Sequence, residues 1–286
     1  MVAVELIGGL GNQMFQYATA RALALFRNEE LSLDNHLFTN YMLHEYGLHH
    51  FNIHCSFFEK ENTAFEPLTT TEKAKAFLYQ KKIYNTYVEK DLRYDEALFE
   101  FSHKNIFLKG YFQSEKYFIT FRDQLRKDFE ITSPLKKETI DFLQIIKTEN
   151  SVSLHIRRGD YVSNPEANAV HGTCDLKYYH RAIEAIKKIV ENPVFFIFSD
   201  DIDWAKANLK INNTTYFVDF NDASTNYEDI KLMSACKHNI IANSSFSWWG
   251  AWLNDNDNKI VIAPNKWFNT DDHNSKDIIP ESWRQI

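Results

Sequence analysis

Residues 151–263 alternate between short apolar runs and longer amphipathic stretches, and this pattern restricts the fold more than any other feature of the chain. The apolar runs predict strands at 152–156, 194–198, 215–218, 239–242 and 260–263. The stretches between them predict helices at 175–191, 203–209, 227–236 and 247–253. Strands separated by helices of about 10 to 15 residues form βαβ units, so we expect a parallel sheet and a Rossmann-like lobe.

The amino-terminal half is less regular. It predicts a strand from Val2, a helix at 13–26, a strand at 31–33, a helical stretch at 71–83, a strand at 106–111 and a helix at 114–128. Residues 36–65 are rich in His, Tyr, Phe and Asn without clean periodicity, and we interpret them as loops and short elements shaping a binding cleft, with irregular packing as the alternative. We expect the halves to join near 131–150, which gives lobes 1–135 and 136–286.

The sequence H-I-R-R-G-D-Y at 155–161 follows the apolar run 151–156. Arg157 and Arg158 would carry two permanently charged, planar guanidinium groups to the carboxyl end of a strand, where α/β sheets collect their ligands. Gly159 allows a sharp turn there. The motif favours a bound pyrophosphate, and an ordinary surface salt bridge between Arg and Asp is the alternative.

The amino terminus contains a strand, a Gly-rich turn and a helix start in V-A-V-E-L-I-G-G-L-G-N-Q-M-F. Gly8, Gly9 and Gly11 allow close backbone approach, and Asn12 and Gln13 place amides at the helix start. The third glycine of a dinucleotide fingerprint is missing, and so is the Lys-Ser or Lys-Thr pair of a P-loop. We interpret the segment as a ligand loop, with a tight turn that packs helix on strand as the alternative.

A third polar segment, N-S-S-F-S-W-W-G-A-W at 243–252, follows the apolar run 238–242. Asn243, Ser244 and Ser245 would offer hydroxyl, amide and backbone N–H groups at a helix start, which is how neutral groups hold phosphate oxygens. Its tryptophans fall on adjoining helical positions, and we expect them to pack against the sheet rather than stack on a ligand: Trp248, Trp249 and Trp252.

Five motifs in this order resemble the α-1,2-fucosyltransferases of glycosyltransferase family 11. They are G-G-L-G-N-Q-M-F-Q-Y-A near the start, G-Y-F-Q-S-E-K-Y-F at 110–118, H-I-R-R-G-D-Y at 155–161, F-S-D-D at 198–201 and N-S-S-F-S-W-W-G-A-W-L at 243–253. The resemblance implies a GT-B fold, with two Rossmann-like lobes and the active site in the cleft between them. Residues 1–135, with the Gly-rich loop, would form the acceptor-side lobe, and residues 136–286 would form the lobe that binds GDP-fucose. It also implies inverting transfer of L-fucose from GDP-L-fucose to the 2-hydroxyl of a terminal galactose in an O-antigen, capsule or Lewis/H-type glycan, without a metal or other cofactor.

The resemblance also implies roles for single residues. A departure of GDP without a metal needs fixed cations and N–H donors at the β-phosphate, and Arg157 is expected to face the diphosphate with Arg158 beside it. Asn12 is expected to position the acceptor and the glycosidic oxygen. The further residues expected to bind the donor are Gly9, Gly11, Asn243, Ser244, Ser245 and Phe246.

The general base is less defined, because a carboxylate or imidazole must lie within hydrogen-bond reach of the attacking hydroxyl. Asp160, Glu166 and His171 are candidates, since the loop after R-R-G-D-Y should border the sugar. For Asp160, holding an arginine is the alternative role. His155 is expected to contact phosphate or orient an arginine, and a purely structural hydrogen bond is its alternative.

An acidic group is the simplest acceptor for the N1 and N2 donors of guanine. Asp200 is the candidate, ahead of Asp219, Asp222 and Asp229, with helix capping as the alternative for each. Asp201 and Asp203 also match the D-x-D pattern of a metal-dependent GT-A glycosyltransferase, which helix capping explains equally well. A glycan-binding protein without turnover is a further alternative.

Composition and charge argue against several classes of protein. A chain of 286 residues with 44% hydrophobic content can bury one large core or two ordinary ones. A net charge of −7 argues against a general nucleic-acid surface, and three widely spaced cysteines indicate thiols in a reducing compartment rather than a disulfide framework or zinc site. The chain has no apolar run of about 18 residues and no signal-peptide pattern. Animal members of the family that it resembles are Golgi-anchored, so the resemblance implies a bacterial, cytoplasmic member, in peripheral contact with the inner membrane if its acceptors are lipid-linked glycans.

Overall fold

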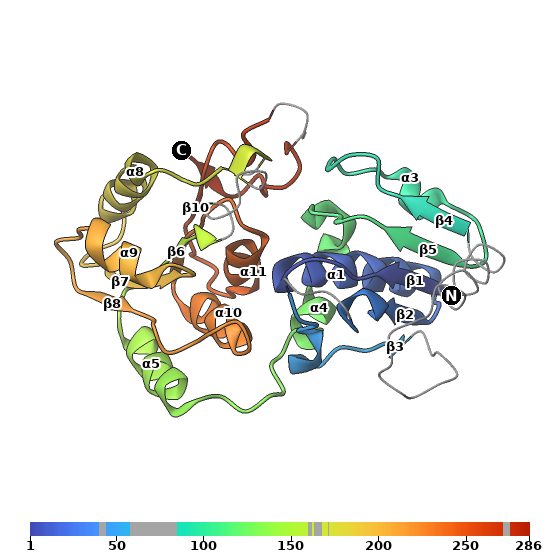
Figure 1. Cartoon of the computed structure of the whole chain (residues 1–286), viewed down its shortest axis with the longest axis horizontal. Coiled ribbons are helices and arrows are strands. Elements are labelled where there is room, and N and C mark those ends of the chain that lie inside the picture. The colour runs from blue at the N-terminus through green and yellow to red at the C-terminus, as the bar shows by residue number, and fades with distance from the viewer. Residues whose placement is uncertain (40–43, 58–84, 160–161, 163–167, 171, 271–274) are drawn as a thin grey trace. The chain divides into compact units, whose positions relative to one another are not determined.

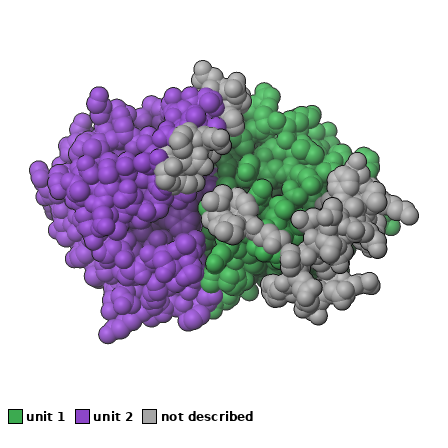
Figure 2. All heavy atoms as spheres, in the orientation of Figure 1, with its two compact units in different colours: residues 1–132, 276–278 green, residues 133–275, 279–286 purple. Residues whose placement is uncertain are grey.

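The computed structural model describes residues 1–39, 44–57, 85–159, 162, 168–170, 172–270 and 275–286. The chain divides into two compact units, coloured green and purple in Figure 2. Unit 1 contains residues 1–132 and 276–278, and unit 2 contains residues 133–275 and 279–286. The sequence predicted one boundary, after residue 135, and did not predict that residues 276–278 belong to unit 1. The helix expected at 71–83 lies outside the described residues.

Unit 1 is built on a parallel sheet of five strands in the order β3-β2-β1-β5-β4 (Figure 1). The strands are β1 (Val2–Glu5), β2 (Leu31–Asp34), β3 (Ser56–Phe57), β4 (Asn85–Val88) and β5 (Ile106–Lys109). The helices and 3₁₀ turns are α1 (Leu10–Arg27), η1 (His36–Thr39), η2 (Leu48–His50), α3 (Ala97–Glu100), η3 (Glu115–Tyr117), η4 (Ile119–Phe121) and α4 (Arg122–Asp128). Because β1 pairs with β5, the loops that follow these two strands lie at one place on the carboxyl edge of the sheet.

Helix α1 begins earlier than the expected residue 13 because Gly9, in an extended conformation, serves as its N-cap. Its sequence is rich in alanine and leucine, which are strong helix formers. The helix ends where Asn28 adopts the left-handed conformation with φ 51°. Most of α1 is buried, including the amides Gln13 and Gln16.

The helix expected at 114–128 is only partly present. Residues 115–121 instead form the 3₁₀ turns η3 and η4, and only 122–128 are α-helical. Phe118 lies between the two turns with φ −139° and ψ 0°, outside the helical region, and this path buries both Phe118 and Tyr117. Packing of these aromatic side chains therefore overrides the local helical pattern. The strand expected to reach 111 ends at Lys109, because Gly110 has φ +153° and turns the chain.

Unit 2 contains a parallel sheet of six strands in the order β11-β10-β9-β6-β7-β8. The strands are β6 (Ser151–Ile156), β7 (Val194–Ser199), β8 (Thr215–Phe217), β9 (His238–Ile240), β10 (Val261–Ala263) and β11 (Arg284–Gln285). The helices are α5 (Lys137–Thr148), α8 (Leu176–Lys187), α9 (Ile202–Asn208), α10 (Asn226–Ala235) and α11 (Ser245–Leu253). This strand order is that of the doubly wound Rossmann sheet, so the expected Rossmann-like lobe is confirmed.

Strand β6 shows how the two faces of this sheet are covered. Val152, Leu154 and Ile156 pack in a core cluster with α8 and α9, whereas the alternate residue His155 packs its ring against Phe246 of α11, with ring centroids 5.6 Å apart. Helices therefore lie on both faces, with α8 and α9 on one and α10 and α11 on the other (Figure 1). Among the described residues, none of the helices has the length and apolar character needed to cross a membrane.

The tryptophans of α11 belong to the core, as the sequence predicts. Trp248 and Trp249 are fully buried and Trp252 is 2% exposed. Their rings pack edge to face, with centroids 5.1 Å apart for Trp248 and Trp249 and for Trp249 and Trp252. Their burial holds α11 against the sheet and thereby fixes the position of its first residues.

Candidate functional site

The chain reverses its direction of winding in unit 2 between β6 and β9, which are neighbours with Leu154 opposite Ile240. In open α/β sheets, such a switch point forms the crevice where ligands bind. The loops that leave β6 and β9 here are the two that carry Arg157 and Ser244. Three sequence motifs thus meet at one sheet edge, because β7, which ends directly before Asp200, pairs with β6 on its other side.

The arginine loop, residues 157–159, is held by two carboxylates at the end of β7. Arg157 Nη1 lies 2.9 Å from Asp200 Oδ2, and the backbone N–H of Arg158 donates to Asp200 Oδ1 at 2.8 Å. Asp200 thus bonds to two successive residues of the loop. A Cβ on Gly159 would lie 2.5 Å from Asp200 Oδ2, so a side chain at this position would displace the Asp200 carboxylate from its present place.

Arg158 has a second set of contacts. Its Nε lies 3.1 Å from Asp201 Oδ2, and its guanidinium carbon lies 3.9 Å from the ring centroid of Trp204. Asp201 also accepts from the backbone N–H of Trp204 as the N-cap of α9. Asp201, the first aspartate of the D-x-D pattern, therefore caps a helix and forms an ion pair. The described residues contain no group of three or more His, Cys, Asp or Glu arranged to hold a metal.

His155 lies beneath the arginine loop and is 4% exposed. Its Nδ1 has no hydrogen-bond partner among the described residues. Burial, and to a smaller extent the positive charge of Arg157, lowers the pKa of His155 to about 3. The imidazole is therefore neutral at physiological pH and offers a buried polar nitrogen rather than a charge.

Helix α11 begins beside this loop. Ser244 is its N-cap in an extended conformation, and its side chain makes no capping hydrogen bond. The first backbone N–H groups of a helix have no partner within the helix, and they carry the positive end of its dipole. Ser245 and Phe246, at the first two helical positions, are partly exposed. This helix start is suited to hold an anion.

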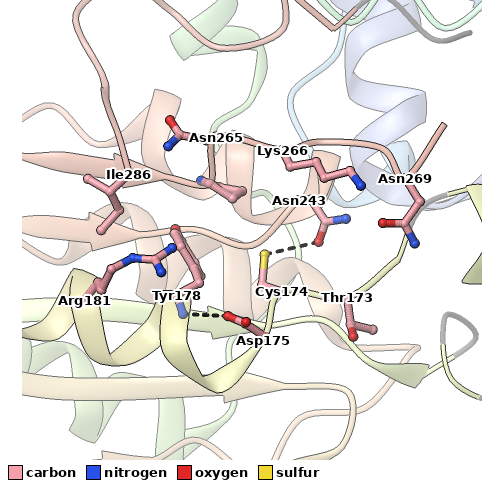
Figure 3. Close-up of a pocket in the computed structure, with 11 residues that line it drawn as sticks. Thr173, Cys174, Asp175, Tyr178, Arg181, Asn243, Asn265, Lys266, Asn269 and Ile286 are labelled. Atoms are coloured by element: carbon pink, nitrogen blue, oxygen red, sulfur yellow. Dashed lines mark hydrogen bonds between the residues drawn. The ribbon is translucent and has the colours of Figure 1, made fainter. Parts of the chain in front are cut away.

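Asn243 has a structural role in the contacts that the structure records. Its Nδ2 donates to the carbonyls of Gly172 and Trp267, and its Oδ1 accepts from the thiol of Cys174 at 3.4 Å. It lines a pocket of about 280 Å³ that Figure 3 shows, with Arg181 beside Tyr178 and the Cys174–Asn243 pair nearby. The other residues of the wall are Thr173, Asp175, Pro264, Asn265, Lys266, Asn269 and Ile286.

The other residues considered for guanine recognition or for the general base do not gather at one place among the described residues. Asp219 pairs with Lys206, and Asp222 accepts hydrogen bonds from Ser224. Burial raises the pKa of Asp229 to about 7, opposed by a hydrogen bond from Asn221. The three candidates for the general base lie outside the described residues: Asp160, Glu166 and His171.

In unit 1, the Gly-rich loop occupies the corresponding carboxyl edge. Gly9 caps α1, Gly11 and Asn12 lie in its first turn, and Asn12 Oδ1 accepts from Gln113 Nε2 at 2.8 Å. The sequence analysis missed two residues of this edge, Gln113 and Glu89. Gln113 lies in the quoted G-Y-F-Q motif, which was the available signal, whereas a lone Glu after a strand carries none.

Both units are α/β structures with parallel sheets, and unit 2 is a Rossmann-like lobe with two arginines at its switch point. This is the architecture of GT-B glycosyltransferases. The chain belongs to glycosyl transferase family 11, whose model matches residues 1–286.

Relatives in sequence agree with the family assignment, and a solved structure agrees with the fold. An α-1,2-colitosyltransferase of Escherichia coli is 39% identical over 295 residues, which cover 100% of this chain and 99% of the relative. The galactoside 2-α-L-fucosyltransferase Sec1 of Mus musculus is 25% identical, over 94% of this chain and 70% of the relative. Among solved structures, POFUT1 in complex with GDP-fucose has a TM-score of 0.52 at 13% identity, over 90% of this chain and 96% of that chain, and this likeness shows the fold.

Proposed function

We propose that this chain is an inverting α-1,2-fucosyltransferase, which moves L-fucose from GDP-L-fucose to the 2-hydroxyl of a terminal galactose. The observation that carries the proposal is the arginine loop beside the start of α11, at adjacent strand ends of a family 11 chain. Cationic forks and helix N–H groups together suit a diphosphate.

The chemistry follows from what leaves the sugar. The acceptor oxygen forms a bond to the anomeric carbon on the face opposite GDP, while the bond from that carbon to the β-phosphate oxygen breaks. The electron pair of the broken bond stays on the phosphate, and the hydroxyl proton passes to a base. In the proposal, Arg157 and the first N–H groups of α11 stabilise the charge that grows on the β-phosphate.

We assign Asp200 to the orientation of the arginine loop. Both of its oxygens bond to that loop, one to Arg157 and one to the backbone of Arg158. These contacts favour a positioning role over the guanine-reading role that the sequence suggested. In the acceptor half of the reaction, we assign Asn12 to holding an oxygen of the acceptor or the glycosidic bond.

A second donor has a specific observation in its favour. The E. coli relative at 39% identity is named as a colitosyltransferase, and colitose is L-fucose without its 3-hydroxyl. GDP-colitose is therefore the second candidate donor, with the same linkage and the same diphosphate contacts.

Transfer assays with both donors test the proposal. GDP-fucose and GDP-colitose are each supplied with lactose or N-acetyllactosamine in excess EDTA, and the linkage is read by NMR. We expect an α-1,2-linked product. Higher kcat/KM with GDP-colitose would assign the second donor, activity restored only by Mn²⁺ would support the metal-dependent alternative, and galactoside binding without GDP affinity would support a glycan-binding protein.

A further inference from the structure

Amide side chains tie together two loops at the carboxyl edge of the unit 1 sheet. Gln16 Oε1 accepts from the N–H of Ile7, after β1, and Gln16 Nε2 donates to the carbonyl of Gly110, after β5, both at 3.0 Å. Because β1 and β5 are neighbours, this side chain holds the loop 6–9 against the turn 110–113. The two loops thus form one hydrogen-bonded assembly at the switch point of this sheet.

The turn 110–113 is also fixed from its other side. Glu89, directly after β4, accepts from the backbone N–H groups of Tyr111 at 2.7 Å and Phe112 at 2.9 Å. A Cβ on Gly110 would lie 2.4 Å from the Cβ of Glu89, so the approach is as close as a glycine permits. Phe112 has φ +53° and is fully buried, which anchors the turn in the core. Gln113 is therefore presented by a rigid support.

The contact with Gln113 bears on which end of the Asn12 amide faces that residue. Gln113 is 8% exposed, and its Nε2 donates to Asn12 Oδ1 at 2.8 Å. Since only the nitrogen of an amide donates, this bond points Oδ1 of Asn12 at Gln113 and turns its donor, Nδ2, away from Gln113. Nδ2 of Asn12 packs against Gly8, and a Cβ on Gly8 would lie 2.7 Å from it. The absence of a side chain at Gly8 therefore leaves space for the Asn12 amide.

We propose that Gln113 is a positioning residue that orients Asn12 with Nδ2 as the outward hydrogen-bond donor to a reacting oxygen. The proposal rests on the proposed function, in which Asn12 holds the acceptor hydroxyl or the glycosidic oxygen. Both oxygens accept a hydrogen bond. A reversed amide would present its own oxygen to them and would repel the negative charge that develops on the leaving group.

The isosteric variant Gln113→Glu tests this orientation. A carboxylate at residue 113 only accepts, so Asn12 must turn Nδ2 inward to satisfy it. We expect kcat to fall about 10- to 100-fold, the scale of a misplaced reacting group, with GDP affinity by calorimetry and thermal midpoint close to wild type. In an Asn12→Ala background, Gln113→Glu should change kcat less than about twofold, because the group that it orients is gone. Gln144→Glu, at an exposed position of α5, is the control with the same change of charge.

A second measurement separates this proposal from the proposed function. In protein labelled with ¹⁵N-asparagine, the side-chain NH₂ resonances of Asn12 are those that vanish in Asn12→Ala. We expect Gln113→Leu and Gln113→Glu to shift these resonances and Gln144→Glu to leave them in place. If the wild-type protein transfers no sugar, the proposed function fails, and the resonances still decide whether Gln113 orients Asn12. Unmoved resonances, or equal kcat losses with and without Asn12, would overturn the proposal.

Discussion

Arg157 and Arg158 leave the same strand, yet their contacts give them different roles. Arg157 pairs with Asp200, whereas Arg158 pairs with Asp201 and lies over the Trp204 ring. Sequence reasoning found both arginines because a charged pair after an apolar strand is unusual. It could not find their partners, because those depend on the register of β6 against β7, which no local pattern specifies.

Replacement of Arg157 should affect turnover far more than folding. We expect Arg157→Ala to lower kcat at least about 100-fold, the scale of losing one oxyanion donor, and Arg157→Lys to recover part of it, since an ammonium keeps the charge without the planar fork. Steady-state kinetics beside circular dichroism checks this. A folded Arg157→Ala protein with nearly full activity would contradict the assignment.

Asp200→Asn distinguishes the two roles considered for this aspartate. If Asp200 orients the arginine loop, the variant should lose turnover about tenfold or more and keep the wild-type ratio of GDP to inosine diphosphate affinity. Inosine diphosphate lacks only the 2-amino group of guanine, so calorimetry with both nucleotides isolates that contact. Loss of the preference for GDP in the variant would restore the guanine-reading role.

Elements with strong periodicity were predictable, and those governed by packing or capping were not. The strands and helices of unit 2 from β6 to β10 agree with expectation within a few residues. The strands β6 and β7 are continuous apolar runs, which made them easy to recognise. Helix α5 was missed, since its sequence K-E-T-I-D-F-L-Q-I-I-K-T lies in what was interpreted as a connection. The break of the expected helix at Phe118 arises from tertiary burial, which local sequence does not report.

Helices α10 and α11 approach closely at Gly250, and this contact predicts a stability effect. A Cβ on Gly250 would lie 2.8 Å from the Cβ of Met233, in the body of α10. We expect Gly250→Ala to lower the free energy of unfolding by about 1–3 kcal/mol, although alanine is the better helix former. Urea unfolding measures it, with Lys231→Ala on the exposed surface of α10 as the control. A stabilised Gly250→Ala protein would show that the helices can separate without loss.

At the scale of the whole molecule, the buried neutral His155 should make stability depend on pH. Its pKa is lowered to about 3 in the folded chain, whereas an unfolded histidine titrates near its usual value of 6.5. Below pH 6.5 the unfolded state binds a proton that the folded state does not bind. The contribution of neutral His155 to stability is therefore present above pH 6.5 and is lost as the pH falls toward 3. From pH 6.5 to 5 the loss is about 2 kcal/mol.

The measurement is urea unfolding at several pH values for the wild-type protein and for His155→Gln, which cannot titrate. Other groups contribute equally to both proteins, so the difference between their slopes reports His155. Parallel slopes between pH 5 and 6.5 would show that the imidazole accepts its proton in the folded state.

The return of residues 276–278 to unit 1 has a consequence for how such enzymes can be recombined. Ile278 is fully buried, and Asp277 accepts from the backbone of Tyr94 and pairs with Lys116 at 2.7 Å. The polypeptide therefore passes between the units three times. A chimaera made by one crossover near residue 132 would join a foreign first unit to the native 276–278 segment. Exchange of the whole of unit 1 between homologous genes thus requires a second, short graft near the 3′ end of the gene.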